Sequence, residues 1–394
     1  MTPDENHANQ AIQSQKARQF DLLTQCAPGF PMGTLLRRFW QPVAQSAKLE
    51  KGRSLPLRLL GEELTLYRGE SGSAYLVAGR CAHRRESLHN GWVQGEQIRC
   101  MYHGWRYDGS GLCNEIPAEK QARNEPVRIA AYPVHEYCGL VFAWMGELNA
   151  DGTAPEFDLP RKHALDEPGR SYVILEQVWD VNWFQQIENS MDAVHLSFAH
   201  GWGKVGRFAE AITSVIPDLV YSETAAGIRQ IATRSPTNVR ISDWTFPNNN
   251  HIVAPGPGKD DPWTDISVWA VPIDERNTRR FTLYAYAAHV KPEDLDTVFQ
   301  PRIHAEWMSQ EQRIPATDEA GEITAQDYVA TSGQGTIVDR TKENLSVSDA
   351  GIVFLRKVFW RELDAIVNGR PTKQWSRLDE APELPIPEIQ ATAG

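Results

Sequence analysis

The sequence predicts an α+β protein in which an all-β domain precedes a larger domain that combines helices with an antiparallel sheet. Short alternating segments, separated by glycine-containing turns, occupy residues 41–144 and are typical of a small β domain. Residues 151–169 are rich in Pro, Gly and charge, which indicates a domain boundary. We therefore expect a helical lead at 1–40, a β domain at 41–150 and an α+β domain at 151–394.

The elements of the first part follow from local patterns. A short helical pattern covers residues 34–40. Runs of alternating apolar and polar residues, bounded by Gly-Glu or Gly-Ser turns, then predict strands at 55–60, 63–67, 74–77 and 97–101.

The second part has longer elements. We expect a strand at 174–179, a helical segment at 182–200 and strands at 227–233, 252–255, 266–272 and 280–290. The last two strands form a hairpin around the polar sequence DERNTRR. A final helix is predicted at 348–368, with an apolar stripe at Ile352, Leu355, Val358, Phe359 and Leu363.

Composition excludes several classes of function. The 394 residues carry 40 Lys and Arg against 51 Asp and Glu, a net charge of −11, which argues against nucleic acid or an anionic membrane as partner. Five cysteines are too few for a disulfide scaffold. The polar N-terminus is unlike a signal peptide, and no apolar run approaches the about 18 residues of a membrane span. We expect a cytoplasmic protein.

Two motifs in the β domain combine cysteine with histidine. Cys81 and His83 form Cys-x-His, and Cys100 and His103 form Cys-x-x-His. Zinc sites usually group cysteine with cysteine and histidine with histidine. One of each per loop suits a [2Fe–2S] cluster in which one iron binds both thiolates and the other both imidazoles. A zinc knuckle is the alternative.

A second group of ionisable residues lies among large apolar side chains. The spacing of Glu188, Asp192 and His195 would place them on one helix face. His195 and His200 can reach one ion only if the helix is distorted, for example by a π-bulge, or ends between them. With a distant carboxylate they fit a two-His-one-carboxylate site that leaves positions on Fe(II) open for dioxygen. Alternatively, both histidines are structural and hydrogen-bond to backbone carbonyls.

In this order, the two motifs resemble those of the catalytic subunit of Rieske non-heme iron oxygenases of the phthalate-dioxygenase type. The resemblance extends from PGFPMGTLLRRFWQPVA near the start to GTIVDRTKENLSVSDAGIVFLRK near the end. It implies a Rieske β domain beside a helix-grip catalytic domain. It also implies that Cys81, His83, Cys100 and His103 hold the [2Fe–2S] cluster and that His195 and His200 bind the mononuclear iron.

The same resemblance gives Asp192 a bridging role. It would hydrogen-bond a ligating histidine and, across a subunit boundary, His103 of a neighbouring copy, and so carry electrons between the metal centres. A homotrimer, or a multiple of one, is implied. Glu188 belongs to the same catalytic group, although many relatives have Asn at this position.

The third iron ligand has three candidates, namely Asp327, Asp339 and Asp349. Asp327, in AQDYVATSGQG, best matches the family position, whereas the other two lie in blocks typical of helix caps or ion pairs. The candidates for the substrate pocket are Phe184, Val194, Phe198, Arg240 and His251.

The chain contains one literal G-x-G-x-x-G, at Gly201, Gly203 and Gly206, but it follows a helix end rather than a strand. We reject it as a dinucleotide fingerprint, and no other segment suggests a nicotinamide or flavin site. Electrons would therefore come from NAD(P)H through a separate flavin and iron–sulfur reductase.

The expected function is that of an oxygenase component which uses O2 to hydroxylate an aromatic substrate, aromatic acids included. An aryl ether-cleaving or O-demethylating monooxygenase is the alternative within the same class. An electron-transfer Rieske protein is the alternative from another class, but it would leave the residues after 150 without a purpose.

Overall fold

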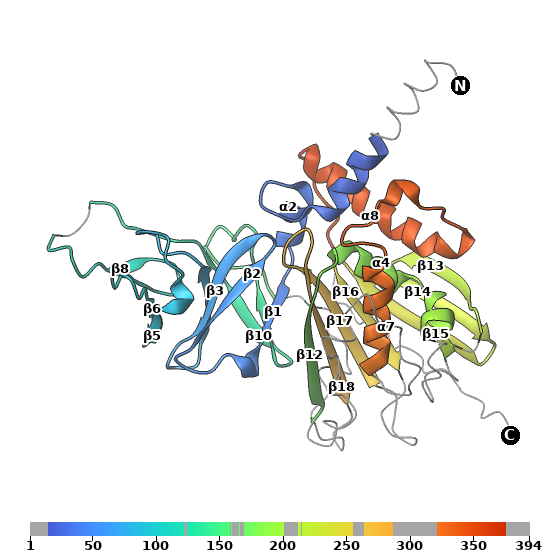
Figure 1. Cartoon of the computed structure of the whole chain (residues 1–394), viewed down its shortest axis with the longest axis horizontal. Helices are drawn as coiled ribbons and strands as arrows, with labels where there is room; N and C mark the ends of the chain where they lie inside the picture. Colours follow the sequence, from blue (N-terminus) through green and yellow to red (C-terminus); the bar gives the residue numbers. More distant parts are fainter. Residues whose placement is uncertain are drawn as a thin grey trace, which may run out of the picture. The chain divides into compact units, whose positions relative to one another are not determined.

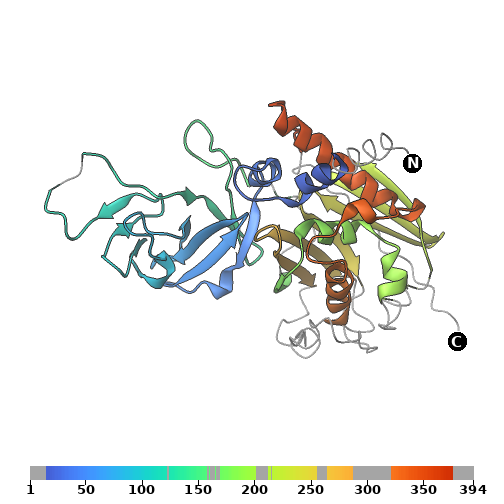
Figure 2. The same cartoon turned by 45° about the horizontal axis from the view of Figure 1, so that its top comes forward.

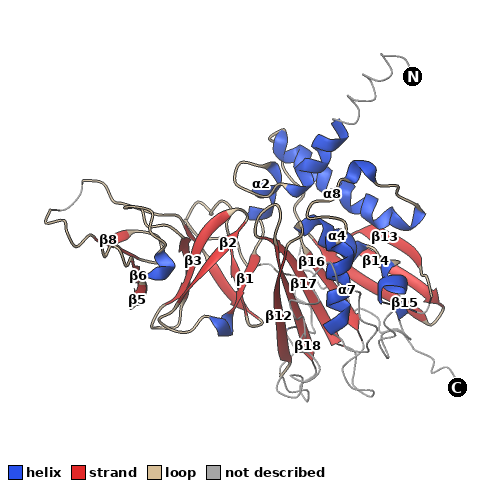
Figure 3. Ribbon diagram, in the orientation of Figure 1, coloured by secondary structure: helices blue, strands red, loops and turns tan. Residues whose placement is uncertain are grey.

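The computed structural model describes residues 15–121, 124–157, 159, 165, 169–200, 212–213, 215–254, 264–286 and 321–375. They belong to two compact units. The first, called the β unit, contains residues 26–158 and 271–274. The second, called the α+β unit, contains residues 1–25, 159–270 and 275–394. Figure 1 shows the elements along the chain, and Figure 3 separates helices from strands.

Three antiparallel sheets form the β unit, after the short helix α2 (Pro31–Arg37). One sheet has the order β1 (Gln41–Gln45), β11 (Leu140–Ala143) and β10 (Val134–Tyr137). The next has the order β2 (Ser54–Leu59), β3 (Glu62–Arg68), β4 (Ala74–Ala78) and β9 (Ala131–Tyr132). The third has the order β5 (Trp92–Gln94), β6 (Gln97–Arg99), β7 (Arg106–Tyr107) and β8 (Cys113–Glu115).

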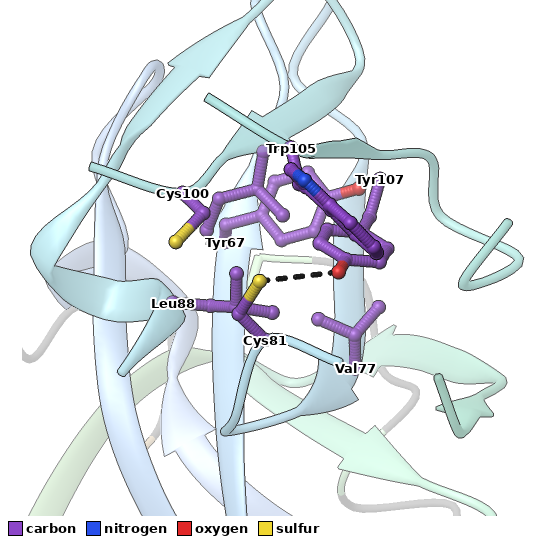
Figure 4. Packing of buried hydrophobic residues seen from close by; sticks show 8 residues of the cluster. Tyr67, Val77, Cys81, Leu88, Cys100, Trp105 and Tyr107 are labelled. Atoms are coloured by element: carbon purple, nitrogen blue, oxygen red, sulfur yellow. Dashed lines mark hydrogen bonds between the residues drawn. The ribbon is translucent and has the colours of Figure 1, made fainter. Parts of the chain in front are cut away.

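A cluster of buried side chains joins the second and third sheets of the β unit. Tyr67 and Val77 come from β3 and β4, and Ile98 and Tyr107 come from β6 and β7. Cysteines 81 and 100 belong to the same cluster, as Figure 4 shows. The loops that carry the Cys-His motifs are therefore anchored in a packed core, and burial of these apolar side chains stabilises them.

One antiparallel sheet of seven strands forms the body of the α+β unit. Its order is β12 (Ser171–Trp179), β18 (Thr278–Tyr286), β17 (Thr264–Pro272), β16 (Asn249–Ala254), β15 (Asn238–Thr245), β14 (Gly227–Ser235) and β13 (Asp218–Glu223). The predicted hairpin is present, because β17 and β18 are neighbours in the sheet. Its predicted last residues, 287–290, lie outside the described residues.

Three helices pack with this sheet: α4 (Trp183–Met191), α7 (Gly321–Ser332) and α8 (Ala350–Val367). Helix α4 contacts α7, α8 and β16, and α8 also contacts β13 (Figures 1 and 2). Large aromatic side chains fill the space between them. Trp183 and Phe184 on α4 meet Phe359 on α8, which also contacts Trp244 of β15.

The structure corrects one predicted helix and adds elements that were not predicted, helix α7 and nine of the strands among them. Residues 182–200 do not form one helix, because α4 ends at Met191 and a separate π-helical turn covers Leu196–His200. Helix α7 was not predicted, since its residues from 324 to 328 are all buried and leave no amphipathic stripe to detect. The short helices are η1 (Ser46–Lys48), η2 (Leu88–Asn90), η7 (Arg340–Lys342) and η8 (Val347–Asp349).

Two further observations concern the glycine motif and membrane-spanning helices. The glycine motif at 201–206 lies outside the described residues. None of the helices in the described part of the chain has the length and hydrophobicity of a membrane span.

Candidate metal centres

The two Cys-His loops of the β unit have matching backbone conformations despite their different spacing. In the first, Arg85 N–H donates to Cys81 O (3.0 Å); in the second, Gly104 N–H donates to Cys100 O (3.0 Å). Arg85 and Gly104 both have positive φ, at 62° and 74°. The Cys81 N–H donates to Glu86 O and the Cys100 N–H donates to Trp105 O, both at 2.8 Å. Two similar turns thus present one cysteine and one histidine each.

The cysteine and histidine side chains of the two loops differ in their exposure to solvent. Cys81 and Cys100 are each 1% exposed, whereas His83 and His103 are exposed. The two imidazole rings lie 4.4 Å apart between centroids, and the His83 ring stacks on Trp105 at 4.8 Å. Two buried thiols and two neighbouring outer imidazoles are the donor set of a cluster with a buried cysteine side and an accessible histidine side.

Tyr107 supports the first cysteine. Its hydroxyl lies 3.2 Å from Cys81 Sγ (Figure 4). The same hydroxyl accepts the backbone N–H of Ala82 at 3.1 Å. Burial raises the pKa of this phenol, so it is neutral and can donate its proton to a thiolate. Hydrogen bonds to the sulfur are among the factors that set the reduction potential of an iron–sulfur cluster.

A single zinc ion does not suit these four donors. Tetrahedral zinc needs all its ligand atoms within about 2.3 Å of the ion. A metal ion needs at least three donor atoms close together. Within the described ranges, one group of His, Cys, Asp or Glu residues has its donor atoms within 4.8 Å of one another, and it consists of His195, His200 and Asp327. The cysteines and histidines of the β unit are more widely spread, as a two-iron cluster between them requires.

The second centre is built where α4 stops. Asp192 follows the helix, and its Oδ1 accepts the backbone N–H groups of Val194 (2.8 Å) and His195 (3.2 Å). This local capping turns the chain before the π-helical turn that carries His200. The predicted condition for both histidines to reach one ion was a helix end or a π distortion between them. The π-helical turn over Leu196–His200 meets it, whereas the end of α4 at Met191 lies before both histidines.

Helix α7 brings the carboxylate. Asp327 Oδ1 lies 3.2 Å from His200 Nε2 and 3.5 Å from His195 Nε2. The two histidine rings are 5.1 Å apart and 72° inclined, so they approach the carboxylate from different directions. Two imidazole nitrogens and one carboxylate oxygen that lie close together are the donor set of a two-His-one-carboxylate site.

Neighbouring side chains hold these donors in place. Gln326 Oε1 lies 2.7 Å from Nδ1 of His200, and the ring Nδ1 of His195 hydrogen-bonds to the backbone carbonyl of Asp192. Asn189 Nδ2 donates to Asp327 Oδ1 at 2.9 Å. Each ring therefore directs Nε2 toward Asp327.

The electrostatics favour an ionised carboxylate. Burial by itself would raise the pKa of Asp327, but His200, His195 and Arg280 hold this pKa well below its usual range. Arg280 is close, with its NH2 group 3.7 Å from Asp327 Oδ2. A deprotonated carboxylate and two imidazole nitrogens are ready ligands for a divalent iron ion.

Asp192 and Glu188 do not join this donor set. Asp192 Oδ2 lies 4.0 Å from His195 Nδ1. Glu188 binds Arg340 (2.6 Å) and Arg356 (2.6 Å) in a buried ion network. The predicted common helix face of Glu188, Asp192 and His195 is wrong, because the helix ends at Met191.

The other two aspartates are caps. Asp339 accepts the Thr341 N–H at 3.2 Å and pairs with Lys342, and Asp349 accepts the Ser346 N–H at 2.6 Å in a capping box. The sequence pointed to neither Gln326 nor Asn189. Gln326 adjoins Asp327 in sequence, but no motif distinguishes it.

The suggested pocket residues have different environments. Phe184 belongs to the aromatic core, with Arg340 over its ring, and Phe198 is 63% exposed. His251 is buried and its Nε2 lies 2.8 Å from Asp265 Oδ1. Arg240 is 4% exposed, and Val194 is half-buried.

Several known proteins are similar to this chain. Residues 39–133 match the Rieske [2Fe–2S] domain family. The chain is 33% identical to the 5,5'-dehydrodivanillate O-demethylase oxygenase subunit of a Sphingobium species, over 96% of this chain and 87% of that protein. It is 31% identical to the phenoxybenzoate dioxygenase subunit alpha of Ectopseudomonas oleovorans, over 93% and 90% of the two chains.

Solved structures share the fold. NdmA of Pseudomonas putida CBB5 superposes with a TM-score of 0.68 at 21% identity, covering 91% of this chain and 98% of that one. The terminal oxygenase of carbazole 1,9a-dioxygenase from Novosphingobium sp. KA1 gives 0.65 at 20% identity, with 90% and 99% covered. The similarity extends over both units, so an electron-transfer protein that needs only the first is not favoured.

Proposed function

The chain belongs to the oxygenase subunits of the Rieske non-heme iron oxygenases, and from this membership we propose that it hydroxylates an aromatic substrate with dioxygen. The observation that carries the proposal is that Asp327, from a distant part of the sequence, converges with His195 and His200 at one buried point. An O-demethylating monooxygenase is the second candidate, because the dehydrodivanillate relative is named as an O-demethylase. Both reactions use the same ligands.

The residues present fit both metal groups. Cys81, Cys100, His83 and His103 would hold the [2Fe–2S] cluster, and His195, His200 and Asp327 would hold the mononuclear iron. When bound, the two groups supply electron transfer and dioxygen activation, respectively. The protein contributes the ligand geometry and the surroundings that tune these groups.

The chain's own residues do the positioning. The Gln326 and Asp192 carbonyl oxygens orient the two imidazoles, and the Asn189 amide orients the Asp327 carboxylate. With His200 only 1% exposed and Asp327 7% exposed, bulk water has little access to the donors. A dry site of this kind limits unproductive side reactions.

The proposal also includes a role for Asp192 in electron transfer between copies of the chain. We assign Asp192 to the bridge toward His103 of a neighbouring copy in a homotrimer or a multiple of one. Its half-buried carboxylate beside the His195 loop and the exposed His103 ring support this assignment. A separate NAD(P)H-dependent reductase would deliver the electrons. Glu188, which the resemblance placed in the catalytic group, acts by supporting α4 through its ion pairs with Arg340 and Arg356.

Oxygen incorporation tests the reaction. The purified holoenzyme, a matched reductase and NADH would be incubated under isotopically labelled dioxygen with a panel of aromatic acids and aryl ethers. Label in a ring hydroxyl group supports hydroxylation, whereas formaldehyde release from a methyl ether supports demethylation. Oxidation of NADH without labelled product from any compound would contradict the proposal.

Spectroscopy tests the cluster and the bridge separately. His103→Ala should abolish the visible spectrum of the Rieske cluster, while Cys113→Ser, a matched change at a cysteine outside both motifs, should preserve it. A His103→Ala protein with an unchanged spectrum would contradict the assignment. Asp192→Ala should retain both metals yet stop turnover; full activity would rule out the bridge.

A further inference from the structure

Two side chains from the edge strands β13 and β14 hold the end of helix α4. Tyr221 of β13 and Gln230 of β14 are directly opposite each other in the antiparallel register, so their side chains share one face of the sheet. The Tyr221 hydroxyl donates to the backbone carbonyl of Met191 at 3.1 Å, and Gln230 Nε2 donates to the same oxygen at 2.8 Å. We call Tyr221 and Gln230 the carbonyl clamp.

The clamp uses both lone pairs of one carbonyl oxygen. Met191 is the last residue of α4, and the last carbonyls of a helix have no partner within the helix. A single donor or a water molecule is enough to satisfy such a group. Here two side chains converge on it, with Gln230 only 4% exposed and the two donor atoms 3.4 Å apart. Two donors from different strands fix the plane of the peptide that follows Met191.

That peptide leads directly into Asp192. The backbone of Asp192 is extended, with φ of −98° and ψ of 100°, so the chain changes direction there. Its Oδ1 is tied to the backbone N–H groups of Val194 and His195, while its side chain keeps 27% of its surface exposed. A rotation of the Met191–Asp192 peptide would therefore redirect the Asp192 carboxylate together with the turn that it caps.

A glycine on α8 keeps the Tyr221 ring in place. Gly351 is the second residue of α8, and an added Cβ would lie 2.5 Å from both Cε1 and Cζ of Tyr221 and 2.7 Å from its hydroxyl oxygen. Glycine within a helix is unfavourable relative to alanine, so its presence indicates a packing requirement. The close approach that Gly351 allows holds the phenol against the Met191 carbonyl.

The phenol donates throughout the neutral pH range. Burial raises the pKa of Tyr221 to about 12, and the charges of Asp192 and Asp349 add to the rise. The influence of Asp192 means that its carboxylate lies within electrostatic range of the phenol. The same two strands also support the next part of the segment, because Ala232 of β14 packs against Ala193 and Leu196.

We propose that Tyr221 and Gln230 are positioning residues, which direct the Asp192 carboxylate toward the neighbouring copy through the Met191 carbonyl. The inference rests on the proposed function, in which Asp192 bridges the metal centres of adjacent copies. A misplacement of about 1 Å at a functional group can cost about 100-fold in rate. Loss of the clamp should therefore slow electron transfer while every metal-binding side chain is retained.

One-electron transfer between the centres tests the assignment without a substrate. The iron-loaded protein would be prepared with an oxidised cluster and ferric mononuclear iron. A flash with a deazaflavin and a sacrificial amine donor then places one electron on the cluster. Decay of the reduced-cluster absorbance measures the passage of that electron to the ferric iron, which becomes ferrous. All variants are compared at full iron occupancy.

Tyr221→Phe and Gln230→Leu should each slow this transfer roughly 10-fold, and Asp192→Ala should slow it further. Tyr172→Phe is the matched control, because it removes a hydroxyl that donates to the Leu165 carbonyl at the other edge of the same sheet. Its transfer rate should equal that of wild type.

Gly351→Ala separates positioning from helix stability. Alanine is the better helix former, yet its Cβ would displace the Tyr221 hydroxyl. This variant should slow transfer about as much as Tyr221→Phe. A crystal structure of the iron-loaded Tyr221→Phe protein should show the Asp192 carboxylate displaced from its wild-type position.

The possible failures are distinguishable. Wild-type transfer in both clamp variants, with slow transfer in Asp192→Ala, would overturn the clamp and leave the bridge. Slow transfer with the Asp192 carboxylate unmoved in the crystal would also overturn the clamp. Wild-type transfer in Asp192→Ala would refute the bridge itself and the clamp with it. If Gln230→Leu does not fold, Tyr221→Phe, which deletes only a hydroxyl group, decides the question.

Discussion

Gln326 Oε1 lies 2.7 Å from Nδ1 of His200, and this contact fixes which ring nitrogen faces Asp327. An amide oxygen only accepts, so the ring donates this hydrogen bond from Nδ1, and Nε2 is the ring nitrogen that faces Asp327 Oδ1, at 3.2 Å. Gln326 and Asp327 are consecutive on α7. One helix thus supplies a ligand and also orients another ligand that comes from a different element.

Loss of this orienting contact should weaken iron binding. Gln326→Leu should reduce the affinity for Fe2+ by about 10- to 100-fold, because the ring of His200 loses its fixed tautomer and orientation. Gln326→Glu retains an acceptor at the same place and should stay close to wild type. Iron content after anaerobic titration measures the difference. Equal affinity in the Leu variant would show that packing alone holds the ring.

Substitutions at the equivalent positions Arg85 and Gly104 of the two cluster loops should have opposite effects on stability. Gly104 has φ of 74°, and an added Cβ would lie 3.0 Å from Pro117 Cγ. Gly104→Ala should therefore lower the stability of the β unit by about 1–2 kcal/mol and reduce cluster occupancy. Arg85→Gly, at a φ of 62°, should cause no loss. Thermal denaturation followed at the cluster absorbance gives both values; equal losses would contradict the backbone explanation.

Glu188 should matter for stability rather than for chemistry. Its carboxylate pairs with Arg340, whose side chain is 0% exposed, and with Arg356, which is 4% exposed. Glu188→Ala leaves two buried guanidinium groups without this partner and should cost about 3–5 kcal/mol. Glu343→Gln, which loses a more accessible partner of Arg356, should cost about 1 kcal/mol or less. Denaturant unfolding measures both, and a stable but inactive Glu188→Ala protein would restore a catalytic role.

The turn after β7 should make the β unit sensitive to acid. Burial alone would raise the pKa of Asp108, but hydrogen bonds from Ser110, Asn114 and Leu112 outweigh it and lower the pKa. A lowered folded-state pKa stabilises the fold above the unfolded value of about 3.9, and the contribution is lost as pH falls through the folded pKa. The advantage of wild type over Asp108→Asn in melting temperature should therefore be constant near neutrality and shrink below about pH 4. A difference independent of pH would contradict this.

The cluster site could be predicted because it is local. Cys81 with His83, and Cys100 with His103, are each placed by a single turn, so the ligand types and their spacing are visible in the sequence. The Trp105 ring against His83 and the Tyr107 hydroxyl against Cys81 depend on packing between strands. No spacing rule predicts them.

The iron site was predictable only in part. His195 and His200 lie in one short segment, and the need for a distorted helix between them follows from helical geometry alone. Asp327 was selected by resemblance, since it comes from a helix whose nearly uniform burial hides its periodicity. The break of α4 at Met191 also moved Glu188 away from the histidines and into an ion network with distant arginines.

The sequence by itself determined the α+β class, the two metal-binding donor types and nine of the eighteen strands in the described residues, because these depend on local spacing and on alternation of apolar residues. Only the tertiary structure decided which distant groups meet. It paired Gln326 with His200, Glu188 with Arg340 and Arg356, and it left Arg234 and Arg240 buried without a described partner. The physical reason is that hydrogen bonds and charge pairs across a core depend on strand register and helix placement, which are fixed by packing of the whole chain.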